Sequence, residues 1–236
     1  MKKVGKFVPF MMLALSLILN SFSSIESKEK IEKDSNGFKN HMEYIGIGHN
    51  EFLEKVYDKG LNSNSSIKEL VMAGSPKDIV HLEFITKMVN SVGQPEVDKH
   101  GNMSIEVGEE IERFLDQNPV LWEFQNKMIT IINEADGKPV EGLISNIKNL
   151  EFEYSKELEG VDLDAMLAVG STARHSALFW SSKIQQKHGG RSHISRYIGR
   201  DFVAMWTVGI VSMFAGPIGV GAALAAGAVA SILTDM

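Results

Sequence analysis

The chain has 236 residues, of which 44% are apolar and 23% are charged, an ordinary composition for a globular protein with a packed core. It contains no cysteine, which excludes disulfides, thiolate metal ligands and cysteine nucleophiles. Its formal charge of −6 argues against a protein that binds nucleic acid in bulk, so no nucleic-acid partner is expected.

The first 23 residues have the pattern of a secretory signal peptide. Three lysines precede an apolar stretch from Phe7 to Leu19, which is too short to span a bilayer. Ser21 and Ser23 have the spacing that a signal peptidase accepts, so we expect cleavage after Ser23. Loss of those three lysines takes the formal charge from −6 to −9. The sequence therefore predicts an exported protein of the medium, periplasm or cell envelope; an uncleaved amphipathic anchor is the alternative.

The middle of the chain predicts a mostly α fold, a multi-helix globule. Residues 24–40 are polar and predict a flexible linker, and residues 41–200 alternate helical patterns with short breakers. Helix starts are expected at Ser75-Pro76 and Asn118-Pro119, because proline suits the first helical position. Further helices are expected over 140–158 and 162–187, and a short strand over 103–107.

The C-terminal segment, residues 201–236, predicts an apolar helical hairpin. No charged residue occurs from Phe202 to Leu233, and Gly216-Pro217 divides this run into two arms. Small residues recur along it, and the last four are spaced by four, so they share one helix face and allow close packing of another helix. The small residues are Ser212, Gly216, Gly219, Ala223, Gly227 and Ser231.

A basic block precedes this hairpin and predicts a basic surface. Between Asp164 and Asp201 there is no acid but there are six bases, namely Arg174, Lys183, Lys187, Arg191, Arg196 and Arg200. Positive charge beside a span normally stays in the cytoplasm, which conflicts with export and disfavours a simple anchor. Two interpretations remain open. Other helices bury the hairpin, or the block attracts an anionic membrane surface and the hairpin inserts.

Two histidines and one asparagine are the candidate functional residues: His49, Asn50 and His175. His49-Asn50 follows a short glycine pair; an anion cradle there is a weak reading, and we favour Asn50 as the cap of a helix over 52–57. His175 lies four residues after Ser171, yet no nucleophile elbow or orienting acid is evident, so no catalytic residue is assigned. Arginines near His188 and His193 argue against a metal site there, and no metal or cofactor is expected.

Three short patches carry a resemblance. They are Gly48-His49-Asn50, Ser171-Thr172-Ala173-Arg174-His175-Ser176 followed by Phe179-Trp180, and Asp201 before the apolar segment. This order resembles a group of small uncharacterised bacterial secreted proteins with an early His-Asn, a serine-rich helix ending in an aromatic-Trp pair, and a glycine-zipper-like tail. The resemblance implies export and a packing role for the tail. Phe179 stands where the group usually has tyrosine.

Together these features favour an exported interaction protein rather than an enzyme. Its C-terminal segment packs helices or associates with membrane, so its expected partner is a membrane surface or another helical protein. Two alternatives stay open. One is a soluble exported enzyme, such as a hydrolase, that uses His49 or His175; the other is a purely structural helical protein.

Overall fold

A computed structural model describes residues 38–92, 95–97, 103–105, 115–188, 194–215 and 220–233. These residues form eight α-helices, one 3-10 helix and a two-stranded antiparallel sheet, which confirms the mostly α prediction. The helices are α2 (Glu43–Asp58), α3 (Ile67–Gly74), the 3-10 helix η1 (Pro76–His81), α4 (Leu82–Ser91), α6 (Pro119–Asn133), α7 (Val140–Tyr154), α8 (Gly160–His188), α9 (Ile194–Ala215) and α10 (Val220–Leu233); the strands are β1 (Pro95–Val97) and β2 (Met103–Ile105).

Several predicted features lie outside the described residues. They are the leader over 1–23, the linker up to residue 37, Arg191, and the break at Gly216-Pro217 with Gly219. The described parts of α8 and α9 include the backbone, but not the side chains, of Lys187 and Ser212.

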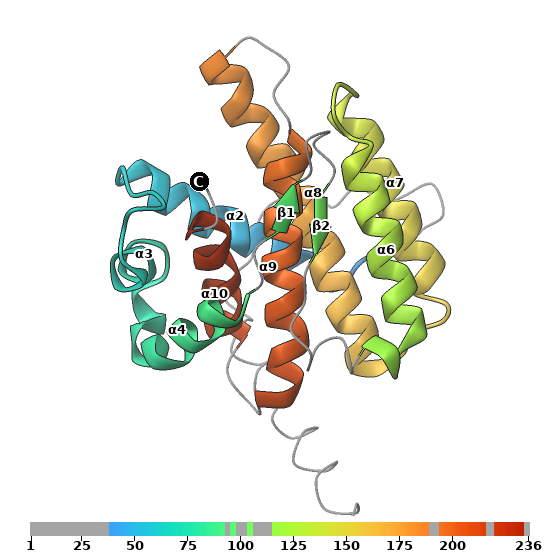
Figure 1. Cartoon of the computed structure of the whole chain (residues 1–236), viewed down its shortest axis with the longest axis horizontal. Coiled ribbons are helices and arrows are strands. Elements are labelled where there is room, and N and C mark those ends of the chain that lie inside the picture. The colour runs from blue at the N-terminus through green and yellow to red at the C-terminus, as the bar shows by residue number, and fades with distance from the viewer. Residues whose placement is uncertain are drawn as a thin grey trace, which may run out of the picture.

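Helices α8 and α9 run through the middle of the molecule (Figure 1). Helices α6 and α7 lie on one side of them, and α2, α3, α4 and α10 lie on the other. The buried apolar side chains form two clusters that follow this division. One joins α6 and α7 to α8 and α9, and the other joins α2, α3, α4 and α10 to Phe179 and Trp180 of α8. Apolar side chains are buried against α8 and α9 from both sides, so this pair of helices is central to the fold.

Local sequence explains most of the boundaries. Pro119 starts α6 as predicted, and Gly137, with φ of 74°, permits the turn before α7. The predicted start at Pro76 is also found, but the first six residues form η1 and the α-helix begins only at Leu82. The amide of Asp78 donates to the carbonyl of Ser75 and the Ser75 hydroxyl donates to the Asp78 carboxylate, which favours the tighter 3-10 turn.

The prediction for the first helix was wrong. Helix α2 begins at Glu43 and not after Asn50, so Asn50 lies inside the helix and does not cap it. Asn40 orders the approach to α2, because its Oδ1 accepts from the amide of Met42 at 2.7 Å and its Nδ2 donates to the Leu167 carbonyl at 2.8 Å. Tertiary contacts therefore override the weak helix propensity of the two glycines.

The predicted strand over 103–107 is found as β2, which pairs with β1 so that Pro95 lies opposite Ile105. Pro95 is the first residue of β1. Proline has no amide hydrogen to donate to a neighbouring strand. The first residue of a short strand is one of the positions where this lack is tolerated.

The C-terminal helices belong to the core of the fold. Helix α9 runs through residue 201, so the expected boundary between a domain over 41–200 and a segment over 201–236 falls inside one helix. All residues from Phe202 to Val208 and from Ala225 to Ile232 are buried. Gly227 leaves room for Met205 of α9, where a Cβ atom would collide with the Met205 sulfur. Among the described residues, no helix is both long and apolar enough to cross a bilayer.

Candidate functional site

The three sequence patches meet in the interior, although they lie far apart along the chain. Helix α2 supplies His49 and Asn50, α8 supplies residues 171–180, and α9 supplies Asp201. The crossing of α2 and α8 depends on Gly46, because a Cβ atom there would lie 2.5 Å from the carbonyl oxygen of Ser171. The glycine at position 46 is thus used for close helix packing, not for an anion cradle.

Arg174 is the centre of a buried ionic cluster. Its guanidinium donates to both carboxylate oxygens of Glu43, at 2.9 and 2.5 Å, and its Nε donates to Glu151 at 3.1 Å. Burial raises the pKa of Glu43, but hydrogen bonds from His175 and Arg174 outweigh it and hold that pKa at about 2. Burial raises the pKa of Glu151 to about 7 against the opposing charge of Arg174. One cation therefore joins α2, α7 and α8.

His175 extends the cluster toward the surface. Its Nε2 lies 2.8 Å from Glu43 Oε1, and its side chain keeps 14% of its exposure. Its backbone carbonyl accepts from Asn50 Nδ2 at 2.7 Å. His175, a candidate functional residue, is thus paired with Glu43 and forms part of the contact between α2 and α8.

Asp201 of α9 forms a second polar cluster with α8. It accepts hydrogen bonds from the hydroxyl of Ser176 and from Trp180 Nε1, the latter at 2.8 Å. The aromatic-Trp pair and Asp201, which the resemblance places in order along the sequence, are therefore in direct contact. The Ser176 proton points to a carboxylate and not to a histidine, which is unlike a serine nucleophile.

His49 is fully buried, and neither ring nitrogen has a hydrogen-bond partner among the described residues. Burial lowers its pKa, and the charge of Asp201 offsets this only in part. The folded protein therefore holds a neutral histidine at a position where the unfolded chain would accept a proton below about pH 6.5.

Replacement of His49 by leucine should flatten the acid limb of the stability profile. The depressed pKa means that His49 favours folding above about pH 6.5 and opposes it as the pH falls, so the wild type should lose more stability than His49→Leu between about pH 7 and pH 5. Glu151 acts in the opposite direction there, since its raised pKa favours folding as the pH falls toward 4.5, and the comparison of the two proteins cancels it. Urea unfolding at each pH measures the difference; parallel profiles would contradict it.

The basic block does not form one basic surface. Arg174 and Arg200 are buried, and the guanidinium of Arg200 lies 5.3 Å from the ring centroid of Tyr197. Arg196 is exposed, and Lys183 is half-buried with its ammonium 5.4 Å from the Phe179 ring centroid. The prediction of a basic surface is therefore wrong for Arg174 and Arg200.

Glu43 and Glu151 are the functional residues that sequence reasoning missed. They lie 131 and 23 residues from Arg174, and nothing in the local pattern marks them. One signal was present. An arginine inside a long helix without any acid in its neighbourhood, on a face with Gly170 and Ala177, needs a carboxylate from another helix if it is buried.

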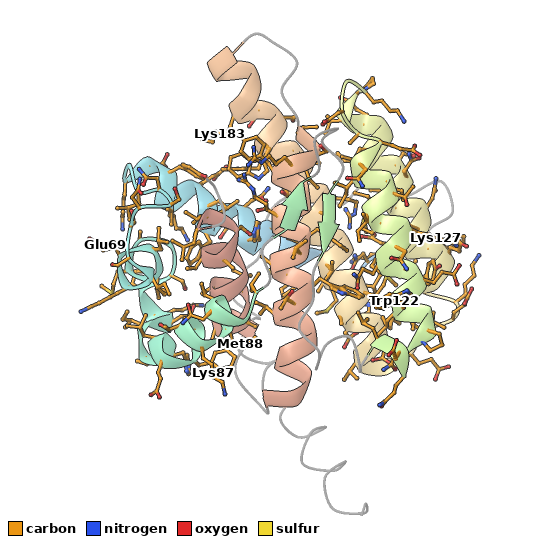
Figure 2. The ribbon with its side chains drawn as sticks, in the orientation of Figure 1. Glu69, Lys87, Met88, Trp122, Lys127 and Lys183 are labelled. Carbon is orange, nitrogen blue, oxygen red and sulfur yellow. The ribbon has the colours of Figure 1, made fainter. Side chains whose placement is uncertain are left out.

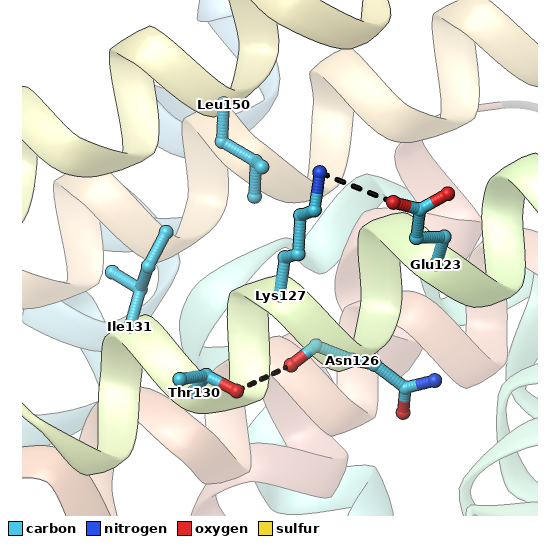
Figure 3. Close-up of a pocket in the computed structure, with 6 residues that line it drawn as sticks. All are labelled: Glu123, Asn126, Lys127, Thr130, Ile131 and Leu150. Carbon is cyan, nitrogen blue, oxygen red and sulfur yellow. Dashed lines mark hydrogen bonds and ion pairs between the residues drawn. The ribbon is translucent and has the colours of Figure 1, made fainter.

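The open groove in Figure 3 lies elsewhere, between α6 and α7. It is lined by Glu123, Asn126, Lys127, Thr130, Ile131 and Leu150. Neither His49 nor His175 lines it. In the part of the chain that the structure describes, no three histidine or acidic side chains are grouped so that they could hold a metal ion.

Comparison with protein-family models, with curated proteins and with solved structures found no match for the chain.

Proposed function

We propose that the protein is an exported interaction protein whose C-terminal helices α9 and α10 are the packed centre of its helical domain. The burial of α10 carries the proposal: all residues from Ala225 to Ile232 are buried, and α10 packs against α2, α3, α4 and α9. The face of small residues is occupied within the protein itself, because the side chain of Met205 of α9 packs against Gly227. This face therefore contributes to the protein's own core.

The pairing of the polar cluster supports binding over catalysis. Arg174, His175 and Asp201 each contact partners on other helices, and these contacts stabilise helix packing. A catalytic site needs groups that converge on an accessible cleft. His49 is fully buried and His175 is bound to Glu43, so an exported hydrolase that uses either residue would first have to open α2 away from α8.

Flotation with phosphatidylglycerol vesicles tests the proposal. We expect the mature chain to stay in the lipid-free fraction at neutral pH and low salt, because its apolar helices are covered by α2, α3 and α4. Recovery of the folded protein with the vesicles under these conditions would overturn the packing role. A separate experiment tests export: cells that express the chain with and without residues 1–23 are fractionated into medium, periplasm and membrane.

Conditional membrane association is the second candidate. The observation that favours it is the absence of any charged residue from Phe202 to Leu233, so that residues 202–215 of α9 and all of α10 would offer uncharged helices to lipid once they are uncovered. Acid should favour that step, because the folded state must keep His49 neutral. Flotation that appears only on acidification would support this candidate, and its absence at acidic pH would remove it.

A further inference from the structure

The imidazole of His49 is enclosed by packed helices and has no polar partner. It is fully buried, and neither ring nitrogen makes a hydrogen bond to a described residue. Its helix α2 packs against both α8 and α10, and Asp201 of α9 is near enough for its charge to act on His49. A proton added to this ring would leave a cation in the core without a hydrogen-bond acceptor, which is costly.

The surrounding helices offer little that would stabilise a charge on His49. The charged groups that α2, α8 and α9 bring near it already have partners, and they are Glu43, Arg174, His175 and Asp201. Helix α10 has no charged residue from Val220 to Leu233. The charged side chains of α3 and α4 lie on the outer side of the molecule, as Glu69 and Lys87 show in Figure 2. An imidazolium at this place therefore needs water.

The contacts of α2 with α8 and with α10 differ in the groups that hold them. Polar contacts hold α2 to α8, namely the pairing of Glu43 with Arg174 and His175, the hydrogen bond from Asn50 Nδ2 to the His175 carbonyl at 2.7 Å and that from the Ser171 hydroxyl to the Glu43 carbonyl at 3.0 Å. Toward α10, a Cβ atom on Gly48 would lie 2.8 Å from Leu224 Cδ1, and most residues of α10 are glycine or alanine. Among the described contacts, separation of α2 from α10 thus breaks fewer polar interactions than separation of α2 from α8.

We propose that protonation of His49 separates α10 from α2 while α2 stays packed on α8. This rests on the proposed role of α10 in the centre of the domain and names how that packing is regulated. Water that enters between α2 and α10 hydrates the ring, so in the open state His49 has the ordinary histidine pKa of about 6.5.

The direction of the response to pH follows from burial. Because burial lowers the pKa of His49 in the closed state, the closed state is favoured above about pH 6.5, and the open state gains on it by up to about tenfold for each pH unit below that. Glu151 of α7 acts in the opposite direction: burial raises its pKa to about 7, so acid favours the packed state there. Acid should therefore loosen α10 and leave the contact of α7 with α8 closed.

Thiol labelling of the full chain tests the inference, because the chain contains no cysteine of its own. Ala228→Cys places a thiol at a buried position of α10, four residues after Leu224 and so on the same helix face, and Ala222→Cys is a second buried probe on α10. Ala177→Cys, on α8 and buried in the cluster with α6 and α7, is the matched control. Dithiodipyridine labels thiols at acidic pH. Division of each rate by that of the same variant in urea removes the pH dependence of the thiol chemistry.

We expect the normalised labelling rate of both α10 probes to be constant above about pH 6.5 and to rise by up to about tenfold per pH unit below it, while the rate of Ala177→Cys stays constant. Addition of His49→Leu, or of His49→Gln as a polar alternative, should abolish the rise. An equal rise at Ala177→Cys, which would indicate global unfolding, overturns the inference, as does a constant rate at both α10 probes or a rise that persists in the His49 variants. The measurement contains no lipid, so its failure leaves the vesicle test at neutral pH unaffected and is distinguishable from failure of the proposed function.

Discussion

Replacement of Arg174 by methionine should destabilise the protein by about 3–5 kcal/mol, the usual cost of removing one partner from a buried ion pair. Arg174 is 5% exposed and is the cation between Glu43 and Glu151, so the variant would leave two carboxylates close together without a compensating charge. For a chain of this length the melting temperature should fall by roughly 6–20 °C. Calorimetry or thermal circular dichroism measures the change.

Lys127→Met is the matched control for the Arg174 variant. Lys127 also lies between two glutamates, Glu123 and Glu153, but these groups are at the surface, where water screens the charges. We expect its melting temperature to stay close to that of the wild type. Equal losses in the two variants would mean that burial of the Arg174 cluster does not determine its contribution.

The Arg174 deficit should also depend on pH and on Glu151. Without the cation, the carboxyls of Glu43 and Glu151 avoid their repulsion by taking up protons, so the deficit relative to the wild type should shrink as the pH falls toward 4.5. The double variant with Arg174→Met and Glu151→Leu removes the more deeply buried acid and should recover part of the loss, leaving Glu43 paired with His175. A double variant less stable than Arg174→Met alone would argue against this account.

The sequence predicted those elements that local rules determine. Proline at position 119 starts α6, the pattern over 162–187 is found as α8, and the short strand near 103 is present. These features depend on backbone geometry and on the spacing of apolar residues, which a single sequence records.

The site escaped prediction because its determinants act over long distances. Glu43 and Arg174 lie 131 residues apart, and their pairing exists only after α2 crosses α8. Gly46 is read locally as a helix breaker, whereas in the fold it is the position that lets the two helices approach. A sequence also does not distinguish a buried arginine from an exposed one, so the basic block by itself predicts a basic surface.

Point variants test the role of the C-terminal helices better than a deletion of residues 201–236 does. Removal of residues 201–236 would delete most of α9 and all of α10, and with them Asp201 and a large share of both apolar clusters. Such a variant would lose its fold, and its behaviour with vesicles would not report on the native protein. Variants that loosen one helix contact keep the chain intact, and they allow the exposure of α10 to be changed in steps.

Gly46→Ala should destabilise the protein, although it adds only a single methyl group. The new Cβ would lie 2.5 Å from the Ser171 carbonyl and hydroxyl oxygens and 2.7 Å from His175 Cδ2, so α2 must move away from α8. Overpacking of this kind costs about 1–3 kcal/mol or more, and here it would also stretch the pairing of Glu43 with Arg174. Alanine gains about 1 kcal/mol over glycine in helix propensity, which the collision must exceed.

Gly142→Ala isolates that propensity gain, because Gly142 is exposed on α7 and a Cβ atom there meets nothing within 4 Å. We expect it to raise the free energy of unfolding by about 0.5–1 kcal/mol while Gly46→Ala lowers it, so identical substitutions in two helices should have opposite signs. Urea unfolding of both variants measures this. If Gly46→Ala also stabilised the protein, α2 and α8 would not be in the close contact on which the assembly of the three patches depends.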